Sequence, residues 1–258
     1  MAKRKIMPMI LALTLSIGLL AGCSSSQPTA QQANQTQSTQ MKIYRGVGQI
    51  PTFRVGPGKD SKGTQVYTFT YVTASAMFDK DGKILDVYLD SLEVSTPNYD
   101  GASMPHFSGW PGTQGYNVTD HKTMEVSEVS KNTDETIAAE VNAWKTKRQR
   151  GNEYGMDYAR DWYKQADFYQ KVFKGKTVSE IEQWYEKNCS DVNGRPLKAD
   201  SKNEKDKEKY AKLTDQEKKD LADIVSGATM SVKDAHGDII GAIKKAYENR
   251  AEITIKTK

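Results

Sequence analysis

The residues whose types and spacing best suit chemistry lie in one short stretch, DIVSGATMS, at positions 223–231. Gly227 and Ala228 have little or no side chain, so a ligand or another protein can approach the backbone closely there. The hydroxyl group of Thr229 follows, and apolar residues at helical spacing over 232–247 predict a helix after it. Because a helix start offers unpaired N–H groups and a partial positive charge, the pattern suits a phosphate group beside Thr229 or bonded to its hydroxyl. A hydroxyl residue that only caps the helix would give the same pattern.

This stretch resembles the flavinylation motif of FMN-binding domains, D-x-x-[S/T]-G-A-T, whose positions are here Asp223, Ser226, Gly227, Ala228 and Thr229. That family includes flavin subunits of sodium-pumping quinone reductases and of Rnf-type complexes, and flavin lipoproteins of extracellular electron transfer. The resemblance implies that an FAD-dependent flavin transferase recognises the segment and joins the phosphate of FMN to the hydroxyl of Thr229. Ser231 is a second candidate neighbour of the phosphate. One motif implies one covalent FMN per chain.

A second part of the chain carries the same resemblance. The sequence FDKDGKI at residues 78–84 is similar to the early strands of that family, which have a D-x-D-G-K turn between two apolar strands. Together the matching parts cover about residues 64–95 and 220–256. The region between them, about residues 96–219, does not match the family, so the resemblance assigns no role to it.

The resemblance implies a membrane-anchored, extracytoplasmic flavoprotein that relays electrons. FMN would carry the redox chemistry, and the protein would supply attachment, orientation and polarity. The sequence contains no HExxH, CxxC or GxSxG pattern, and its three histidines, His106, His121 and His236, are scattered. We therefore expect no catalytic residue and no metal site, and an electron carrier that is a substrate of the transferase rather than an enzyme. Its redox donor and acceptor would include partners such as a quinone-linked membrane complex.

A loop rich in aromatic residues and glycine is another candidate ligand surface. It spans residues 95–123, with the core HFSGWPGTQGY. Trp110, with His106 and Tyr116, is a candidate neighbour of the flavin, because a planar ring needs a stacking surface. A packed loop whose aromatic side chains only fill a hole explains the same residues. An aromatic surface would also suit the alternative function, a non-redox solute-binding or envelope-interaction lipoprotein.

The N-terminus has the features of a bacterial lipoprotein signal. The basic segment KRK at residues 3–5 precedes an apolar run over residues 6–20. This run is shorter than the ~20 residues of a permanent membrane span. The sequence LAGC then ends at Cys23 and resembles a lipobox, so we expect residues 1–22 to be a signal peptide and Cys23 to carry lipid. An ordinary signal peptide with an incidental cysteine is the alternative.

The segment that follows Cys23 is expected to be a disordered tether. Residues 24–40 are polar and uncharged and have no apolar period, so they cannot bury enough surface to fold. The lipid and the tether, residues 23–40, would hold the folded domain at the extracytoplasmic face of the cell membrane.

Composition excludes other classes of protein. The 258 residues are 37% hydrophobic and 27% charged, with a mean hydropathy of −0.71, which excludes a polytopic membrane protein. The formal net charge of +4 falls to +1 without residues 3–5, so charge gives no reason to expect nucleic acid as a partner. If Cys23 carries lipid, Cys189 is the only other cysteine and no intrachain disulfide can form. Cys189 is expected to be a small side chain at a helix end.

The pattern at the start of the folded region, residues 41–258, predicts antiparallel strands. Alternating β-branched and aromatic residues predict strands at 64–72, 75–78 and 84–92, with an Asp-Gly turn between the last two. A final alternating segment at 251–256 could close the sheet.

Helices are predicted between these strands. Threonines that can act as N-caps predict three helix starts, at Thr133, Thr177 and Thr214, and the last of these helices should end near Ala222. An apolar stripe predicts another helix over residues 156–173. The expected fold is therefore α+β: a small antiparallel sheet with packed helices, a long helical and loop insertion at about residues 96–219, and a disordered tether in front.

Overall fold

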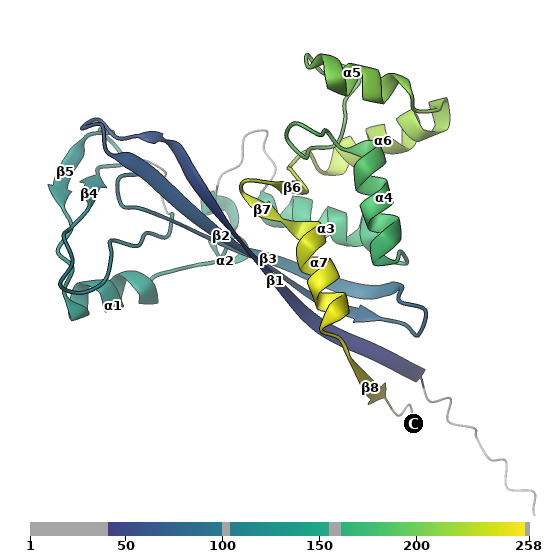
Figure 1. Cartoon of the computed structure of the whole chain (residues 1–258), viewed down its shortest axis with the longest axis horizontal. Coiled ribbons are helices and arrows are strands. Elements are labelled where there is room, and N and C mark those ends of the chain that lie inside the picture. The colour runs from purple at the N-terminus through teal and green to yellow at the C-terminus, as the bar shows by residue number, and fades with distance from the viewer. Residues whose placement is uncertain (1–40, 100–103, 155–160, 256–258) are drawn as a thin grey trace, which may run out of the picture. The chain divides into compact units, whose positions relative to one another are not determined.

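The computed structural model describes residues 41–99, 104–154 and 161–255 (Figure 1). The predicted signal peptide, Cys23 and the tether lie outside these residues. The described chain forms a four-stranded antiparallel sheet with helices packed against it, so the predicted α+β fold is confirmed. No helix within these ranges is long and apolar enough to cross a membrane.

The main sheet has the strand order β3-β2-β1-β8, with every pair antiparallel. Its strands are β1 (Met41–Lys59), β2 (Gln65–Phe78), β3 (Ile84–Ser95) and β8 (Ala251–Ile255). The predicted hairpin is confirmed: Asp79 accepts hydrogen bonds from the backbone N–H groups of Asp81 and Lys83, and Gly82 supplies a positive φ of 80°. The predicted final strand is also confirmed, as it pairs with β1 at the sheet edge.

Two features of the sheet differ from the sequence prediction. The long strand β1 was missed, because Gly46, Gly48, Pro51 and Gly56 interrupt the alternation that would reveal a strand. The two strands predicted over 64–78 form one continuous strand, β2.

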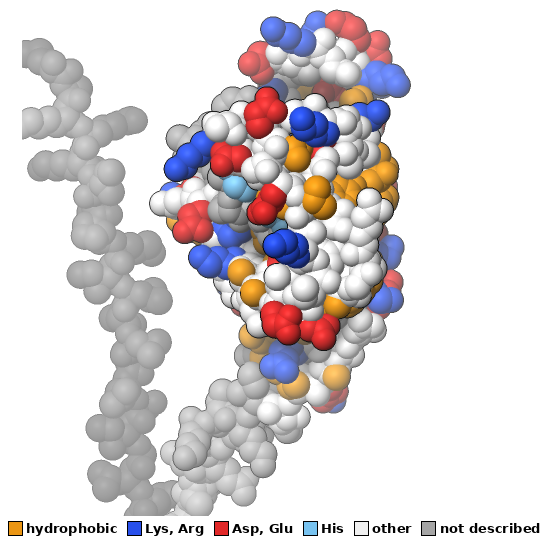
Figure 2. All heavy atoms as spheres, turned by 90° about the vertical axis from the view of Figure 1, so that its left-hand side faces the viewer, with side chains coloured by type: hydrophobic (Ala, Val, Ile, Leu, Met, Phe, Trp, Pro, Cys, Tyr) orange, Lys and Arg blue, Asp and Glu red, His pale blue; other side chains and the backbone are white. Residues whose placement is uncertain are grey.

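The helices are α1 (Asp134–Asn142), α2 (Lys147–Arg150), α3 (Trp162–Phe173), α4 (Val178–Asn188), α5 (Glu204–Ala211), α6 (Asp215–Gly227) and α7 (Ile239–Glu248). The shorter elements are the 3-10 helix η1 (Gly151–Tyr154) and the strands β4 (Asn117–Thr119), β5 (Val126–Val129), β6 (Lys233–Asp234) and β7 (Gly237–Asp238). The predicted N-caps Thr133, Thr177 and Thr214 are confirmed, because each accepts a hydrogen bond from the backbone N–H three residues later. Acidic and basic side chains are interspersed over the face shown in Figure 2.

The region predicted as an insertion shares the core of the sheet. Ala166, Tyr169 and Phe173 of α3 are fully buried and pack with residues of β2, β3 and α7 in one hydrophobic cluster. Ile181 of α4 joins the same cluster. Cys189 lies at the end of α4, as predicted. It is buried, and burial raises the pKa of its thiol to about 12.

Helix α7 lies directly against β1 because two glycines there leave no side chain in the way. A Cβ atom on Gly46 would collide with the carbonyl oxygen of Ala246, and one on Gly48 would collide with that of Ala242. Both alanines are fully buried. This close approach holds the C-terminal helix on the face of the sheet (Figure 1).

We therefore expect Gly48→Ala to lower the free energy of unfolding by about 1–3 kcal/mol, the usual cost of overpacking a close contact. Gly58→Ala is the matched control on the same strand, because a Cβ atom there meets nothing within 4 Å. Urea unfolding of both variants checks this. Equal stability of the two variants would contradict the described packing of α7 on β1.

Candidate functional site

The first half of the sequence motif lies at the end of a helix. Asp223, Ser226 and Gly227 belong to the last turn of α6. The prediction that this helix ends near Ala222 is wrong, because the apolar stripe continues through Ile224, which packs against the main core. The exposed hydroxyl of Ser226 donates a hydrogen bond to the carbonyl oxygen of Asp223.

The helix predicted directly after Thr229 begins later. Helix α7 starts at Ile239, beyond the β6–β7 hairpin, and the side chain of Asp238 already accepts a hydrogen bond from Gly241 N at its first turn. The start of α7 is therefore not the phosphate site that the sequence suggested. His236, expected inside this helix, lies in the turn between β6 and β7, where it is exposed.

The second half of the motif is an extended segment that α3 holds in place. The side-chain oxygen of Gln165 accepts hydrogen bonds from Thr229 N at 2.8 Å and Met230 N at 2.9 Å. Gln165 is only 1% exposed, so these bonds are shielded from water. The hydroxyl of Tyr169 donates to the carbonyl oxygen of Met230 at 2.8 Å. One face of α3 thus fixes the backbone on both sides of the Thr229–Met230 peptide.

The hydroxyl group of Thr229 has no hydrogen-bond partner among the described residues. Thr229 is half-buried, its backbone is bound to Gln165, and no described residue hydrogen-bonds its side-chain oxygen. Ser231 differs, because its hydroxyl donates to the carbonyl oxygen of Asn193 at 2.6 Å. The sequence suggested both hydroxyls as neighbours of a phosphate. Among the described residues, the hydroxyl of Ser231 has a hydrogen-bond partner and that of Thr229 has none.

A cavity of about 160 Å³ lies beside the motif. Apolar and aromatic side chains form much of its wall, and polar side chains from several elements complete it. Its lining residues are Val72, Ser91, Lys147, Tyr154, Trp162, Arg195, Met230, Ser231, Asp234, His236, Gly237 and Ile239. Planar aromatic surfaces with a few convergent polar groups are typical of sites for small planar ligands.

One buried polar atom in this wall lacks a partner. Ser91 is 2% exposed, and its hydroxyl makes no hydrogen bond within the described structure. An unsatisfied buried hydroxyl is unfavourable, by roughly 1–3 kcal/mol, unless a ligand or water satisfies it. The wall of the cavity therefore offers a polar contact that the protein itself does not use.

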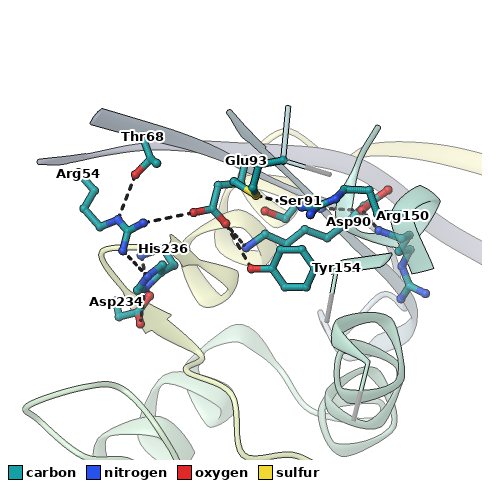
Figure 3. A network of polar contacts seen from close by, with 12 residues as sticks. Arg54, Thr68, Asp90, Ser91, Glu93, Arg150, Tyr154, Asp234 and His236 are labelled. Atoms are coloured by element: carbon teal, nitrogen blue, oxygen red, sulfur yellow. Dashed lines mark hydrogen bonds and ion pairs between the residues drawn. The ribbon is translucent and has the colours of Figure 1, made fainter. Parts of the chain in front are cut away.

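A buried ion pair joins this wall to strand β3, within the polar network of Figure 3. Lys147 Nζ is 2.9 Å from a carboxylate oxygen of Glu93, and both side chains are about 95% buried. The hydroxyl of Tyr154 also donates a hydrogen bond to Glu93, at 3.3 Å. Burial by itself raises the pKa of Glu93, but Lys147, His236 and Arg54 together lower it by more, so the net shift is downward. Burial lowers the pKa of Lys147, but Tyr154 and Glu93 raise it by more.

The network continues to the β6–β7 hairpin through Arg54 of β1. One guanidinium nitrogen of Arg54 lies 3.6 Å from Glu93, and another donates to His236 Nε2 at 2.7 Å. Because arginine can only donate, Nε2 is an acceptor and the Nδ1 proton of His236 points to Asp234, 3.1 Å away. His236 thus links Arg54 to Asp234 in this network (Figure 3).

The structure does not bring Trp110 to this cavity. Trp110 is 70% exposed and packs edge-on against Phe107. The hydroxyl of Tyr116 donates a hydrogen bond to the carbonyl oxygen of Gln65, and the ring of His106 stacks on that of His121. Their loop joins the sheet at its end beside β4 and β5 (Figure 1). The cavity lies near the middle of the β2–β3 pair, where Val72 and Ser91 line it.

Sequence reasoning missed several residues of the site. Lys147 and Arg54 come from segments that were given no role, and no local pattern marks them. Glu93 did carry a signal, since it stands on the inward-facing side of the alternating strand β3, where Val87 and Leu89 are buried. A charged residue at such a position needs a buried partner.

Comparison with known proteins gives a match to a named enzyme. A chlorophenol reductase of Desulfitobacterium hafniense is 32% identical over 219 residues, which cover 82% of this chain and 59% of that protein. This chain therefore spans less than two thirds of the length of the curated relative it matches. No family model and no solved structure matches the chain.

This match corrects one expectation from the sequence. The chain was expected to be an electron carrier and not an enzyme, but the relative that aligns with most of it is a named enzyme, a reductase. The prediction that the chain is not an enzyme is therefore wrong. The resemblance to FMN-binding domains stays a prediction.

We expect Gln165→Leu to lower the free energy of unfolding by about 1–3 kcal/mol for each backbone N–H that loses its buried acceptor. Hydrogen exchange at the amides of Thr229 and Met230 should become faster in this variant. Gln183→Leu, on the exposed face of α4, is the control and should leave both quantities unchanged. Unchanged exchange at Thr229 in the Gln165 variant would contradict the role of α3 in holding the motif.

Proposed function

We propose that this chain is a flavin-dependent redox protein that takes part in a reduction, with FMN bonded through its phosphate to Oγ1 of Thr229. The observation that carries the proposal is the position of the motif threonine. Its backbone is fixed by Gln165, its hydroxyl is open, and the cavity begins one residue later, at Met230. The named reductase that aligns with most of the chain supports a redox role.

The side chains around the cavity are of the kinds that hold a planar ring. Tyr154 and Trp162 supply aromatic surface, and the unpartnered hydroxyl of Ser91 supplies a hydrogen bond for a polar ring atom. Lys147 adds a buried ammonium group. FMN, when bound, would supply the transfer of electrons. The protein would hold the ring, shield it from water and fix its polar edge.

Modification by an external enzyme is compatible with the position of the motif. Asp223 and Ser226 are exposed at the end of α6, so an FAD-dependent flavin transferase can reach them. Ala228 is fully buried and Gly227 packs against the ring of Phe168, where a Cβ atom would collide. The small residues of the motif are thus explained by packing, and its polar residues remain available for recognition.

We further propose that the protein works at the extracytoplasmic face of the cell membrane, anchored by lipid on Cys23. The sequence pattern at residues 1–23 supports this, and the polar segment 24–40 would act as the spacer. A covalent bond suits this location because a dissociating flavin would be lost by diffusion. Electrons would come from a quinone-linked membrane complex. The name of the relative gives a chlorophenol as that protein's substrate, and the reducible substrate of this chain is left open.

Thr229→Ala should give a folded, colourless protein when it is produced together with a flavin transferase. Its free energy of unfolding should change by no more than about 0.5 kcal/mol, because the lost hydroxyl has no described partner. Thr229→Ser should keep part of the flavin, and Ser231→Ala should keep all of it. Intact mass and mapping of the peptide over residues 213–233 check this.

An FMN adduct on Ser231 would move the attachment site. A wild-type protein without any adduct, after production with an active transferase, would defeat the proposed function and favour the non-redox lipoprotein.

Cys23→Ala should abolish lipidation and leave an uncleaved precursor, while the folded domain still acquires its flavin. The reason is that the tether separates the anchor from the domain. Metabolic labelling with a palmitate analogue and cell fractionation check this. Ser24→Ala is the control and should stay acylated. Continued acylation of the Cys23 variant would contradict the lipobox.

A further inference from the structure

The cavity beside the motif has room for one six-membered ring. Its volume of about 160 Å³ is close to the ~150 Å³ of an engineered apolar protein cavity that binds benzene. A flavin has three fused rings, so the flavin proposed on Thr229 would reach this space only from the side of Met230. The space itself suits a smaller molecule.

Part of the wall is apolar and belongs to the main core. Val72, Met230 and Ile239 all line the cavity, are buried, and belong to the main hydrophobic cluster. A hydrocarbon ring gains from leaving water for such surroundings. A small number of polar groups in an otherwise apolar wall then fix the orientation of a ligand.

One of these polar groups is the buried hydroxyl of Ser91. Ser91 stands opposite Val72 in the β2–β3 pair and is 2% exposed, and its hydroxyl has no partner among the described residues. Ser95, further along β3, also has a buried hydroxyl without a partner, but it does not line the cavity. A hydroxyl can donate one hydrogen bond and accept others, so a flavin beside the cavity and a molecule inside it can both use Ser91.

The second polar group is the guanidinium of Arg195, the charge in this wall that remains unpaired. Arg195 is exposed, and its side chain has no hydrogen-bond or ion-pair partner in the described part of the chain. Lys147, by contrast, is paired with Glu93 at 2.9 Å. Asp234 accepts hydrogen bonds from the backbone and the ring of His236. A guanidinium group binds a carboxylate through two parallel hydrogen bonds.

We propose that the cavity is a binding site for a carboxylate with a single six-membered ring and an oxygen substituent, of the hydroxybenzoate class. The ring packs against the apolar wall and the carboxylate binds Arg195. Because Ser91 is buried and Arg195 is exposed, they lie at different depths of the cavity, and a ligand with polar groups at two ends of its ring uses both. This inference goes beyond the proposed function and does not need the flavin.

The test measures binding of 4-hydroxybenzoate by titration calorimetry, to flavinylated protein and to the flavin-free Thr229→Ala protein. We expect both proteins to bind it. Benzoate, which lacks the ring oxygen, should bind about fivefold more weakly, and 4-hydroxybenzyl alcohol, which lacks the charge, about tenfold more weakly. The two-ring compound 6-hydroxy-2-naphthoate should not bind, because it exceeds the cavity.

Two variants separate the roles of the two polar groups. Arg195→Gln should remove the preference for 4-hydroxybenzoate over the alcohol, and Ser91→Ala should remove the preference over benzoate. Ser91→Ala should not lower the free energy of unfolding, because the lost hydroxyl has no described partner. Lys198→Gln, an exposed cation outside the cavity, and Ser95→Ala are the matched controls and should keep both preferences.

Failure of both proteins to bind 4-hydroxybenzoate would overturn this inference, as would equal binding of the two-ring compound. Binding that Arg195→Gln and Ser91→Ala both leave unchanged would also overturn it, and Arg195 is exposed, so its variant decides even if the Ser91 variant fails to fold. Binding by the flavin-free protein alone would show that the flavin fills the cavity and would overturn the site in the flavinylated protein. Wild-type protein that binds 4-hydroxybenzoate but carries no FMN would defeat the proposed function and support this site.

Discussion

The buried carboxylate of Glu93 is the constraint on which the site depends. A charge on the inward face of a strand is costly unless it is paired and hydrogen-bonded. The charge of Glu93 is paired with Lys147 of α2 and Arg54 of β1, and its carboxylate accepts a hydrogen bond from Tyr154 of η1. Through Arg54 the same network reaches His236 and so ties the β6–β7 hairpin to the sheet. Polar groups thus remain where apolar side chains would otherwise close the core, and the cavity is kept open beside the motif.

The second element of the site is the short extended segment after α6. Gly227 permits close packing against Phe168, and Gln165 satisfies both N–H groups that follow Ala228. The backbone around Thr229 is therefore rigid while its hydroxyl is not engaged. This combination suits a residue that must be presented in one position to a modifying enzyme and then carry a group into the neighbouring cavity.

Local signals in the sequence were sufficient for much of the fold. The Asp-Gly turn after Phe78 predicted the β2–β3 hairpin, and the threonine N-caps predicted the starts of α1, α4 and α6. These features depend on a few neighbouring residues. Strand β1 was missed because close packing against α7 requires its glycines, and the same glycines hide the strand pattern.

The site depends on contacts that no local pattern encodes. Arg54 and His236 are 182 positions apart, and Gln165 meets Thr229 from 64 positions away. The motif itself was visible in the sequence, but its place at the end of α6 was not, because the β6–β7 hairpin separates it from α7. The place of the aromatic loop around Trp110, away from the cavity, was not visible in the sequence for the same reason, since strand pairing sets it.

A crystal structure of the protein isolated after flavinylation tests the central claim most directly. The account predicts electron density that runs from Oγ1 of Thr229 through a phosphate to a flavin ring on the side of the cavity that Met230 and Ser91 line. Density for a flavin attached to another residue, or for a ring outside the cavity while Thr229 carries the phosphate, would contradict it.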